Sequence, residues 1–145
     1  TADELVPLAH WVTPEIEIRR YDTRFFLARM PADQIAKHDE SETTALEWLS
    51  PREAMARFAR KELLLPPPTW TTIWQLAKRT SIEDAMQQAK ATPIVRIMPG
   101  FFKLGDEVTL TLPGDPTFPP VPGWDVPDAT RFVLEDGVRW VPRRV

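Results

Sequence analysis

Alternating residue types predict a β-strand near the start of the chain. Residues 16–30 are rich in Ile, Tyr, Thr and Phe, which favour strands. Alternate residues of this strand fall on opposite sides, with Tyr21, Thr23, Phe25 and Leu27 on one and Arg20, Asp22, Arg24 and Phe26 on the other. Residues 31–43 then predict a polar loop with an acidic end, and residues 44–49 a second, short strand.

A helix start follows this short strand. Ser50 is a favourable N-cap residue, Pro51 suits the first helical position, and Glu53 stands where a capping box needs an acid. The spacing of apolar residues predicts a helix from Ser50 to Leu63 that packs through Met55 and Phe58.

Two more helices are expected before residue 91. The prolines Pro66–Pro68 stop the first helix, and Thr69 is expected to cap a second that runs to about residue 80. Ser81 and Asp84 form another capping-box pair, which predicts a third helix through about Lys90.

The chain changes character from Ala91 onward, where nine of its sixteen prolines lie. Residues 107–112 alternate as a strand, and Asp136-Gly137 between two apolar stretches is a strong signal for a β-hairpin. The expected organisation is therefore an α/β body over residues 1–90 and a proline-rich, hairpin-containing β tail over residues 91–145.

Composition narrows the class of protein. A chain of 145 residues is long enough for one domain with its own core, and 43% hydrophobic and 27% charged residues are typical of a globular protein. A net charge of −3 gives no reason to expect nucleic acid or an anionic membrane as a partner. The absence of cysteine suits a reducing compartment, and with no signal peptide pattern the expected location is the cytoplasm.

Few residues suggest chemistry by themselves. The sequence has no glycine-rich phosphate loop and no cysteine nucleophile, and its two histidines lack metal-ligand spacing. The acidic residues Asp39, Glu40 and Glu42 are the best candidates for an accessory Mg²⁺ site, because this ion prefers carboxylate oxygens. The alternative is a solvated acidic loop, which residue type alone favours.

A basic group is the candidate for substrate binding. Arg20 and Arg24 would lie on one face of the first strand, where forked guanidinium groups suit phosphate oxygens. The alternative is a polar strand face paired with nearby acids. The tryptophans Trp48, Trp70 and Trp74 fall on apolar faces, so we expect them in the core rather than at a ligand.

Three motifs in fixed order carry a family resemblance. They are W-V-T-P from Trp11 followed by R-Y-D-T-R-F-F from Arg20, E-x5-W-x-S-P-x-E-A from Glu42, and K-E-L-L-L-P-P-P-T from Lys61. Over about residues 8–80 the chain resembles the C-terminal half of the coenzyme A diphosphatase branch of the Nudix hydrolases.

The resemblance implies a fold and an activity. The implied fold is an α/β/α sandwich, to which this chain contributes a part. The implied activity is hydrolysis of coenzyme A, or of a related nucleotide diphosphate derivative, at its pyrophosphate with Mg²⁺ or Mn²⁺. In the family those ions bind to the pattern G-x5-E-x7-R-E-x-x-E-E-x-G, which this chain lacks.

The missing pattern leaves three hypotheses. The chain is a fragment, or its other half is a separate chain, or it is a non-catalytic remnant that serves as a binding or interaction module. The first two are favoured, because half of a mixed sheet would leave edges and core uncovered. No catalytic residue is therefore expected on this chain, and the chain alone is expected to be inactive.

Overall fold

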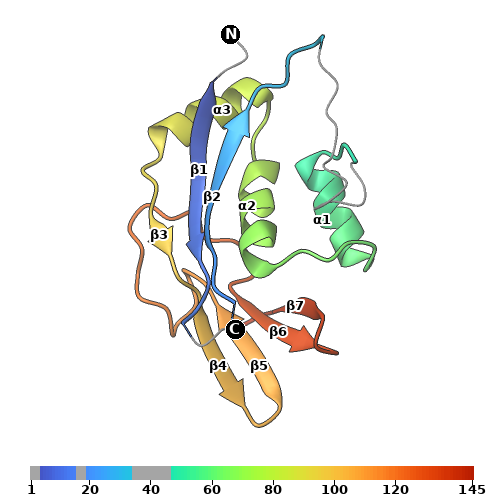
Figure 1. Ribbon diagram of the computed structural model, residues 1–145, viewed down its shortest axis with the longest axis vertical. Helices are drawn as coiled ribbons and strands as arrows, with labels where there is room; N and C mark the ends of the chain where they lie inside the picture. Colours follow the sequence, from blue (N-terminus) through green and yellow to red (C-terminus); the bar gives the residue numbers. More distant parts are fainter. Residues whose placement is uncertain (1–3, 16–18, 34–46) are drawn as a thin grey trace.

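A computed structural model describes residues 4–15, 19–33 and 47–145 of the chain. It contains two sheets and three helices (Figure 1). The elements in chain order are β1 (Leu5–Val12), β2 (Asp22–Ala28), α1 (Pro51–Ala59), α2 (Pro67–Ala77), α3 (Ile82–Ala91), β3 (Arg96–Ile97), β4 (Gly100–Leu104), β5 (Glu107–Thr111), β6 (Arg131–Glu135) and β7 (Arg139–Arg143).

The first sheet, called the mixed sheet below, has the strand order β2-β1-β3. β1 runs antiparallel to β2 and parallel to β3, and a bulge between Pro7 and Ala9 shifts its register. Of the strand predicted over residues 16–30, the structure forms Asp22–Ala28, while residues 16–18 lie outside the described part. β1 was not predicted, because Pro7 and the bulge interrupt its alternation.

Helix α1 begins where the sequence predicted. The Ser50 hydroxyl accepts a hydrogen bond of 3.1 Å from the Glu53 backbone N–H, and Phe58 is buried. The helix ends at Ala59 rather than at Leu63, because Lys61 adopts a left-handed conformation with φ of 63°.

The proposed role of Thr69 as a cap is wrong. Helix α2 already begins at Pro67, and its N-cap residue Pro66 supplies no side-chain hydrogen bond. Proline fits the first turn of a helix, because a backbone N–H at that position would have no acceptor within the helix. Helix α3 is confirmed: the Ser81 hydroxyl accepts a 3.0 Å bond from the Asp84 N–H.

The chain after residue 91 forms β3, which joins the mixed sheet, and an antiparallel sheet of order β4-β5-β6-β7. The strand predicted over residues 107–112 is β5, and the predicted hairpin connects β6 to β7. Asp136 and Gly137 both have positive φ, at 54° and 68°, as a two-residue turn of the type I′ class requires.

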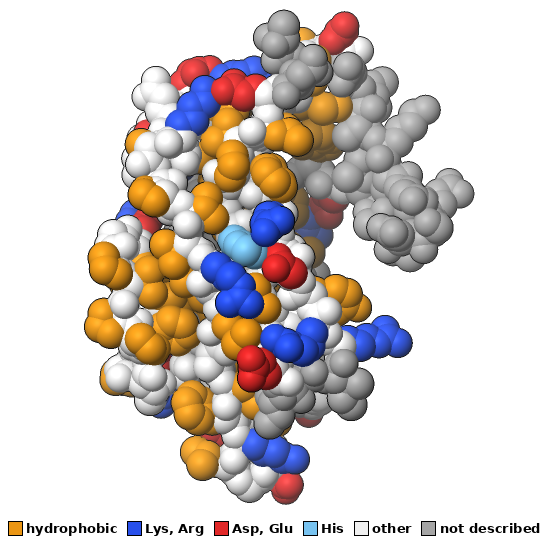
Figure 2. All heavy atoms as spheres, turned by 60° about the vertical axis from the view of Figure 1, so that its left-hand side comes forward, with side chains coloured by type: hydrophobic (Ala, Val, Ile, Leu, Met, Phe, Trp, Pro, Cys, Tyr) orange, Lys and Arg blue, Asp and Glu red, His pale blue; other side chains and the backbone are white. Residues whose placement is uncertain are grey.

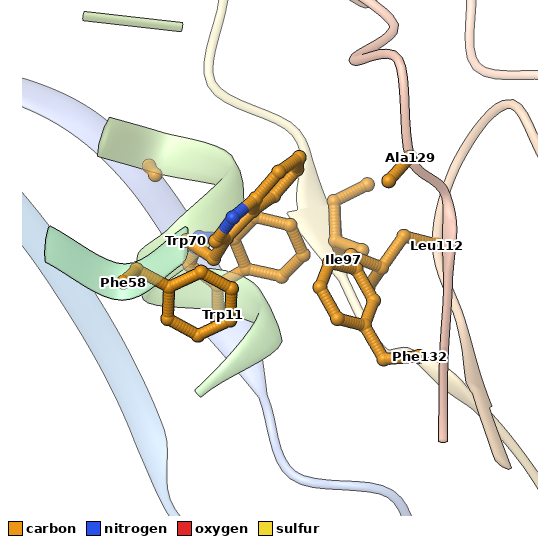
Figure 3. Packing of buried hydrophobic residues seen from close by; sticks show 8 residues of the cluster. Trp11, Phe58, Trp70, Ile97, Leu112, Ala129 and Phe132 are labelled. Carbon is orange, nitrogen blue, oxygen red and sulfur yellow. The ribbon is translucent and has the colours of Figure 1, made fainter. Parts of the chain in front are cut away.

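One hydrophobic cluster joins the helices, the mixed sheet and the antiparallel sheet (Figure 3). Its largest members are Trp11, Phe58, Trp70, Leu112 and Phe132. The Trp70 and Phe132 rings meet edge to face at 5.2 Å, a favourable aromatic geometry. Residues 1–90 and 91–145 thus share a core, and the boundary drawn at residue 90 stays a prediction.

The fate of the tryptophans shows how far packing follows the sequence pattern. Trp70 is buried and Trp74 packs against the core, as predicted. The expectation for Trp48 was wrong: it is 70% exposed, and residues 47–49 are not in a strand. The apolar pattern around Trp48 therefore does not correspond to a buried side chain at this position in the part of the chain that the structure describes.

The α/β class is confirmed as three helices, a mixed sheet and an antiparallel sheet. In Figure 1 helices α2 and α3 lie behind β1 and β2, and α1 lies beside α2. Among the described residues no helix covers the other side of the mixed sheet, where an α/β/α sandwich has its second helical layer. None of the described helices is long and apolar enough to cross a membrane.

Candidate functional site on the open face of the mixed sheet

The two faces of the mixed sheet differ in what covers them. On the face toward the helices, Ala9, Trp11 and Ile97 are buried in the core. On the opposite side, called the open face below, Arg24 and Arg96 are exposed. The open face is made of Leu5, Pro7, His10, Val12, Asp22, Arg24, Phe26, Ala28 and Arg96, of which Val12 is buried.

Strand register aligns three nitrogen-bearing side chains across the open face. His10 of β1 pairs with Arg24 of β2 on one side and with Arg96 of β3 on the other. Because neighbouring strands lie about 4.8 Å apart, the three residues form a row, called the basic row below, about 10 Å long. Figure 2 shows the histidine in pale blue with basic side chains in blue and an acidic side chain in red around it.

A carboxylate orients the centre of the basic row. His10 Nε2 lies 2.7 Å from Asp22 Oδ1. A carboxylate only accepts hydrogen bonds, so the proton of this bond is on Nε2. The hydrogen bond from His10 lowers the pKa of Asp22 below its ordinary value, and the charges of Arg24 and Arg96 add to this effect.

The open face is anchored by contacts on the strand ends. Thr13 and Tyr21 join the ends of β1 and β2, because the Thr13 N–H donates to the Tyr21 carbonyl and the Tyr21 N–H to the Thr13 hydroxyl, each at 2.9 Å. Next to His10, the Trp11 indole N–H donates to the buried Thr72 hydroxyl of α2 at 3.2 Å. These contacts therefore fix the part of β1 that directly follows His10.

The predicted site residues fare differently. Arg24 lies on the open face as expected, but Arg20 precedes β2 and is not part of the strand. The joint role of Arg20 and Arg24 in substrate binding therefore stays a prediction, and Arg96 is the arginine that the strand register aligns with Arg24. The predicted metal ligands Asp39, Glu40 and Glu42 lie outside the described residues, so their role stays a prediction.

His10 and Arg96 were missed in the sequence. β3 has only two residues, and its parallel partner lies more than eighty positions earlier in the chain. No local pattern reports such a pairing. For His10 the sequence offers one indirect hint, since this residue stands directly before the W-V-T-P motif of the family resemblance.

The open face does not fit a divalent metal ion. Within the described residues no three His, Cys, Asp or Glu side chains come close enough to hold one. Among the described residues, Asp22 is the one carboxylate that contacts the basic row. Its hydrogen bond to His10 already uses the Nε2 nitrogen, which a metal ion would need. Two guanidinium groups around a single carboxylate give an excess of positive charge, which suits an anion.

Comparison with known proteins gives a family. A family model described as the NUDT19 Nudix domain matches residues 4–76. Similar relatives are the acyl-coenzyme A diphosphatases NUDT19 of Xenopus laevis, 28% identical over 79% of this chain, and of Homo sapiens, 32% identical over 72% of it. The chain spans only 32% and 29% of those two proteins. No solved structure matches.

Proposed function

The chain belongs to the NUDT19 Nudix domain family, and on that basis we propose that it is the C-terminal portion of a metal-dependent Nudix pyrophosphohydrolase. Its substrate is coenzyme A or a related nucleotide diphosphate derivative. The basic row on the open face carries this proposal, because it gives the family's fold segment a site for an anionic ligand.

The basic row suits the phosphate groups of such a ligand. Arg24 and Arg96 present forked donors about 10 Å apart, with His10 between them. Coenzyme A carries a 3′-phosphate besides its pyrophosphate, so two arginines can each meet a phosphate group. Asp22 orients the His10 ring between the two arginines through its hydrogen bond of 2.7 Å.

The contribution of this chain to the reaction is binding and orientation. The glutamate-rich pattern of the family does not occur in its sequence, so we place the catalytic carboxylates on another segment or chain. An Mg²⁺ or Mn²⁺ ion held there would neutralise phosphate oxygens and lower the pKa of a water molecule.

A binding measurement tests the assignment of the basic row. Calorimetric titration of the chain with coenzyme A should show binding that weakens about tenfold or more in Arg24→Ala and Arg96→Ala, because each removes charge-assisted hydrogen bonds. Arg143→Ala, at an exposed position of β7 in the other sheet, is the matched control and should have little effect. If all three variants bind coenzyme A as the parent does, the basic row is not the site.

The same variants identify the phosphate that is bound. A ligand lacking the 3′-phosphate should lose the contribution of one arginine only, so one variant should weaken coenzyme A binding but leave this ligand unaffected. Equal effects of both variants on both ligands would place the two arginines on the pyrophosphate alone.

A turnover assay separates the enzyme from a non-catalytic binding module. Incubated alone with coenzyme A and Mg²⁺ or Mn²⁺, the chain should release no 4′-phosphopantetheine. Turnover should appear when a polypeptide with the glutamate pattern of a relative is co-expressed with it. Turnover by the chain alone would contradict the division of roles, and binding without turnover in the co-expressed pair would favour the binding module.

A further inference from the structure

The antiparallel sheet ends in a strand that is paired on one side only. β4 pairs with β5 from Gly100 to Leu104, and among the described residues no strand pairs with its other side. Figure 1 shows the β4–β5 hairpin extending from the lower end of the molecule, with β4 at its margin. Alternate residues of such an edge strand point their N–H and C=O groups away from the sheet, where another strand can bind them.

Apolar side chains are exposed along this edge. Phe102 is 43% exposed and Leu104 is 74% exposed. Because they alternate along β4, both project from the same face of the sheet, and Gly100 on that face adds no side chain. The edge therefore combines free backbone groups with apolar surface, which is the combination that favours the addition of a further strand.

The opposite edge of the same sheet is protected against such pairing. In β7, Pro142 has no backbone N–H to donate. Two copies of β7 paired antiparallel about Val141 would also place Arg139 of one copy opposite Arg143 of the other, and like charges in opposed positions repel. β4 contains no proline and a single charged residue, Lys103. Of the two edges of this sheet, β4 is thus the one open to pairing.

The residues of β4 are complementary to a second copy of the same strand. Antiparallel pairing about a twofold axis at Phe102 sets the two Phe102 rings opposite each other, and aromatic cross-strand pairs are favourable. In this register Leu104 lies opposite Gly100 of the second copy, so a large exposed side chain meets a position without one. Lys103 lies opposite Phe101 of the second copy, where an ammonium group and an aromatic ring attract each other.

Charge and backbone geometry select this register over its neighbours. An axis at Lys103 would set two ammonium groups opposite each other. An axis at Phe101 would bring Pro99, which lacks an N–H, into the pairing. An axis at Leu104 would include Gly105, whose φ of 61° is not extended. Pairing about the central residue of β4 is therefore the arrangement that uses the whole strand without opposed charges.

We propose that two copies of this chain associate through β4, so that their antiparallel sheets join into one continuous sheet. The interface is isologous, because the same strand supplies both sides. It is small, so monomer and dimer exchange with concentration. β4 lies outside residues 4–76, which the family model matches, so this association concerns a part of the chain to which the proposed function gives no role.

Sedimentation equilibrium of the chain tests the association. From low micromolar to submillimolar concentration, the average mass should rise from 16.6 kDa toward twice that value. Phe102→Lys should raise the dissociation constant at least about tenfold, because it opposes two ammonium groups at the axis. Leu104→Lys, at a more exposed position, should also weaken the dimer and leaves the fold less affected. Val138→Lys is the matched control, since Val138 is 64% exposed in the other hairpin, and should change nothing.

A single new thiol tests the register. The chain has no cysteine, so Phe102→Cys places one thiol in each copy. Because opposed Cβ atoms of an antiparallel pair lie about 5 Å apart, a short bis-maleimide should join two such copies covalently. Val138→Cys, which is at least as accessible, should remain monomeric under the same conditions. Equal linking of both variants would indicate random collision and would overturn the proposal.

Three further results would also overturn it. These are a monomer at every concentration, a dimer that neither Phe102→Lys nor Leu104→Lys weakens, and a mass that keeps rising beyond that of a dimer, which indicates open-ended rather than twofold association. The outcome is separate from that of the proposed function. Leu104→Lys should bind coenzyme A as the parent does, because β4 belongs to the antiparallel sheet and the basic row to the mixed sheet.

Discussion

The two faces of the mixed sheet are made from the same strands and have opposite properties. On one face Trp11 is 3% exposed, donates a hydrogen bond to Thr72 and packs edge to face with Trp124 at 5.7 Å. On the other face its neighbour His10 bonds to Asp22 beside two exposed arginines. The difference shows how one strand presents a packed face and a charged face: we expect stability to depend on one set of residues and, under the proposed function, ligand binding on the next.

Substitution of Trp11 gives the largest expected effect and tests the covered face. Trp11→Ala should lower the free energy of unfolding by about 3–5 kcal/mol, because it leaves a cavity in the shared core and removes the partner of Thr72. His10→Ala, one residue away, should cost far less. Urea denaturation of both variants measures the contrast, and similar losses would mean that the two faces do not divide the roles.

The ion pair of Asp115 with Arg131 should have the next largest effect. Asp115 is 3% exposed and accepts two hydrogen bonds from Arg131 at 2.9 Å each, and two more from Thr117. Asp115→Asn should cost about 1–3 kcal/mol of unfolding free energy, because the half-buried Arg131 guanidinium loses its charged partner and the buried side chain loses acceptor capacity. Thr117→Ala, which removes one of the four bonds, should cost less in the same denaturation assay.

The Asp115 pair also predicts a pH dependence. Burial raises the pKa of Asp115, but the hydrogen bonds from Arg131 and Thr117 outweigh it and hold the pKa below its ordinary value. The unfolded state therefore binds the proton more readily. The stabilisation is complete above the unfolded pKa of about 3.9 and is lost as pH falls through the lower folded value.

Melting temperatures measured across the acidic range check this sign. The parent protein should lose stability toward pH 3 more steeply than Asp115→Asn does. Equal slopes for the two proteins would show that the Asp115 pair does not contribute to the acid sensitivity.

The Ser50 cap should have a smaller effect. Its bond to the Glu53 N–H lies on an exposed helix end, so Ser50→Ala should cost about 1 kcal/mol, and Ser50→Asp should restore most of that loss. Chemical denaturation measures both variants. A loss as large as that of Trp11→Ala would show that helix α1 depends on its cap more than on the burial of Phe58.

The smallest stability effect is expected on the open face, where it sharpens the comparison most. Arg24→Ala should change the free energy of unfolding by no more than about 0.5 kcal/mol, because the side chain is exposed. It should nevertheless weaken coenzyme A binding, as stated above. A destabilisation well above this value would give Arg24 a structural role on the open face instead.

Much of the local structure could be predicted because its cause is local. Ser50, Ser81 and Asp136-Gly137 set the helix starts and the hairpin through bonds and φ angles within a few residues. Thr69 was misassigned for a local reason as well, since consecutive prolines fit the first helical turn better than they end a helix. The three motifs also allowed the family to be recognised from the sequence, because their residues and their order can be read without a structure.

Residue patterns alone were enough to predict the α/β class, the positions of α1, α3, β5 and the β6–β7 hairpin, the place of Arg24 on a polar strand face, and the Nudix relationship. They did not show that His10 and Arg96 join Arg24, that Trp48 is exposed, or which strands lie at the sheet edges. Each of these depends on contacts between segments far apart in the chain, above all the two-residue strand β3 beside β1. Hydrophobic periodicity reports which face of an element is buried, but not which distant element it meets.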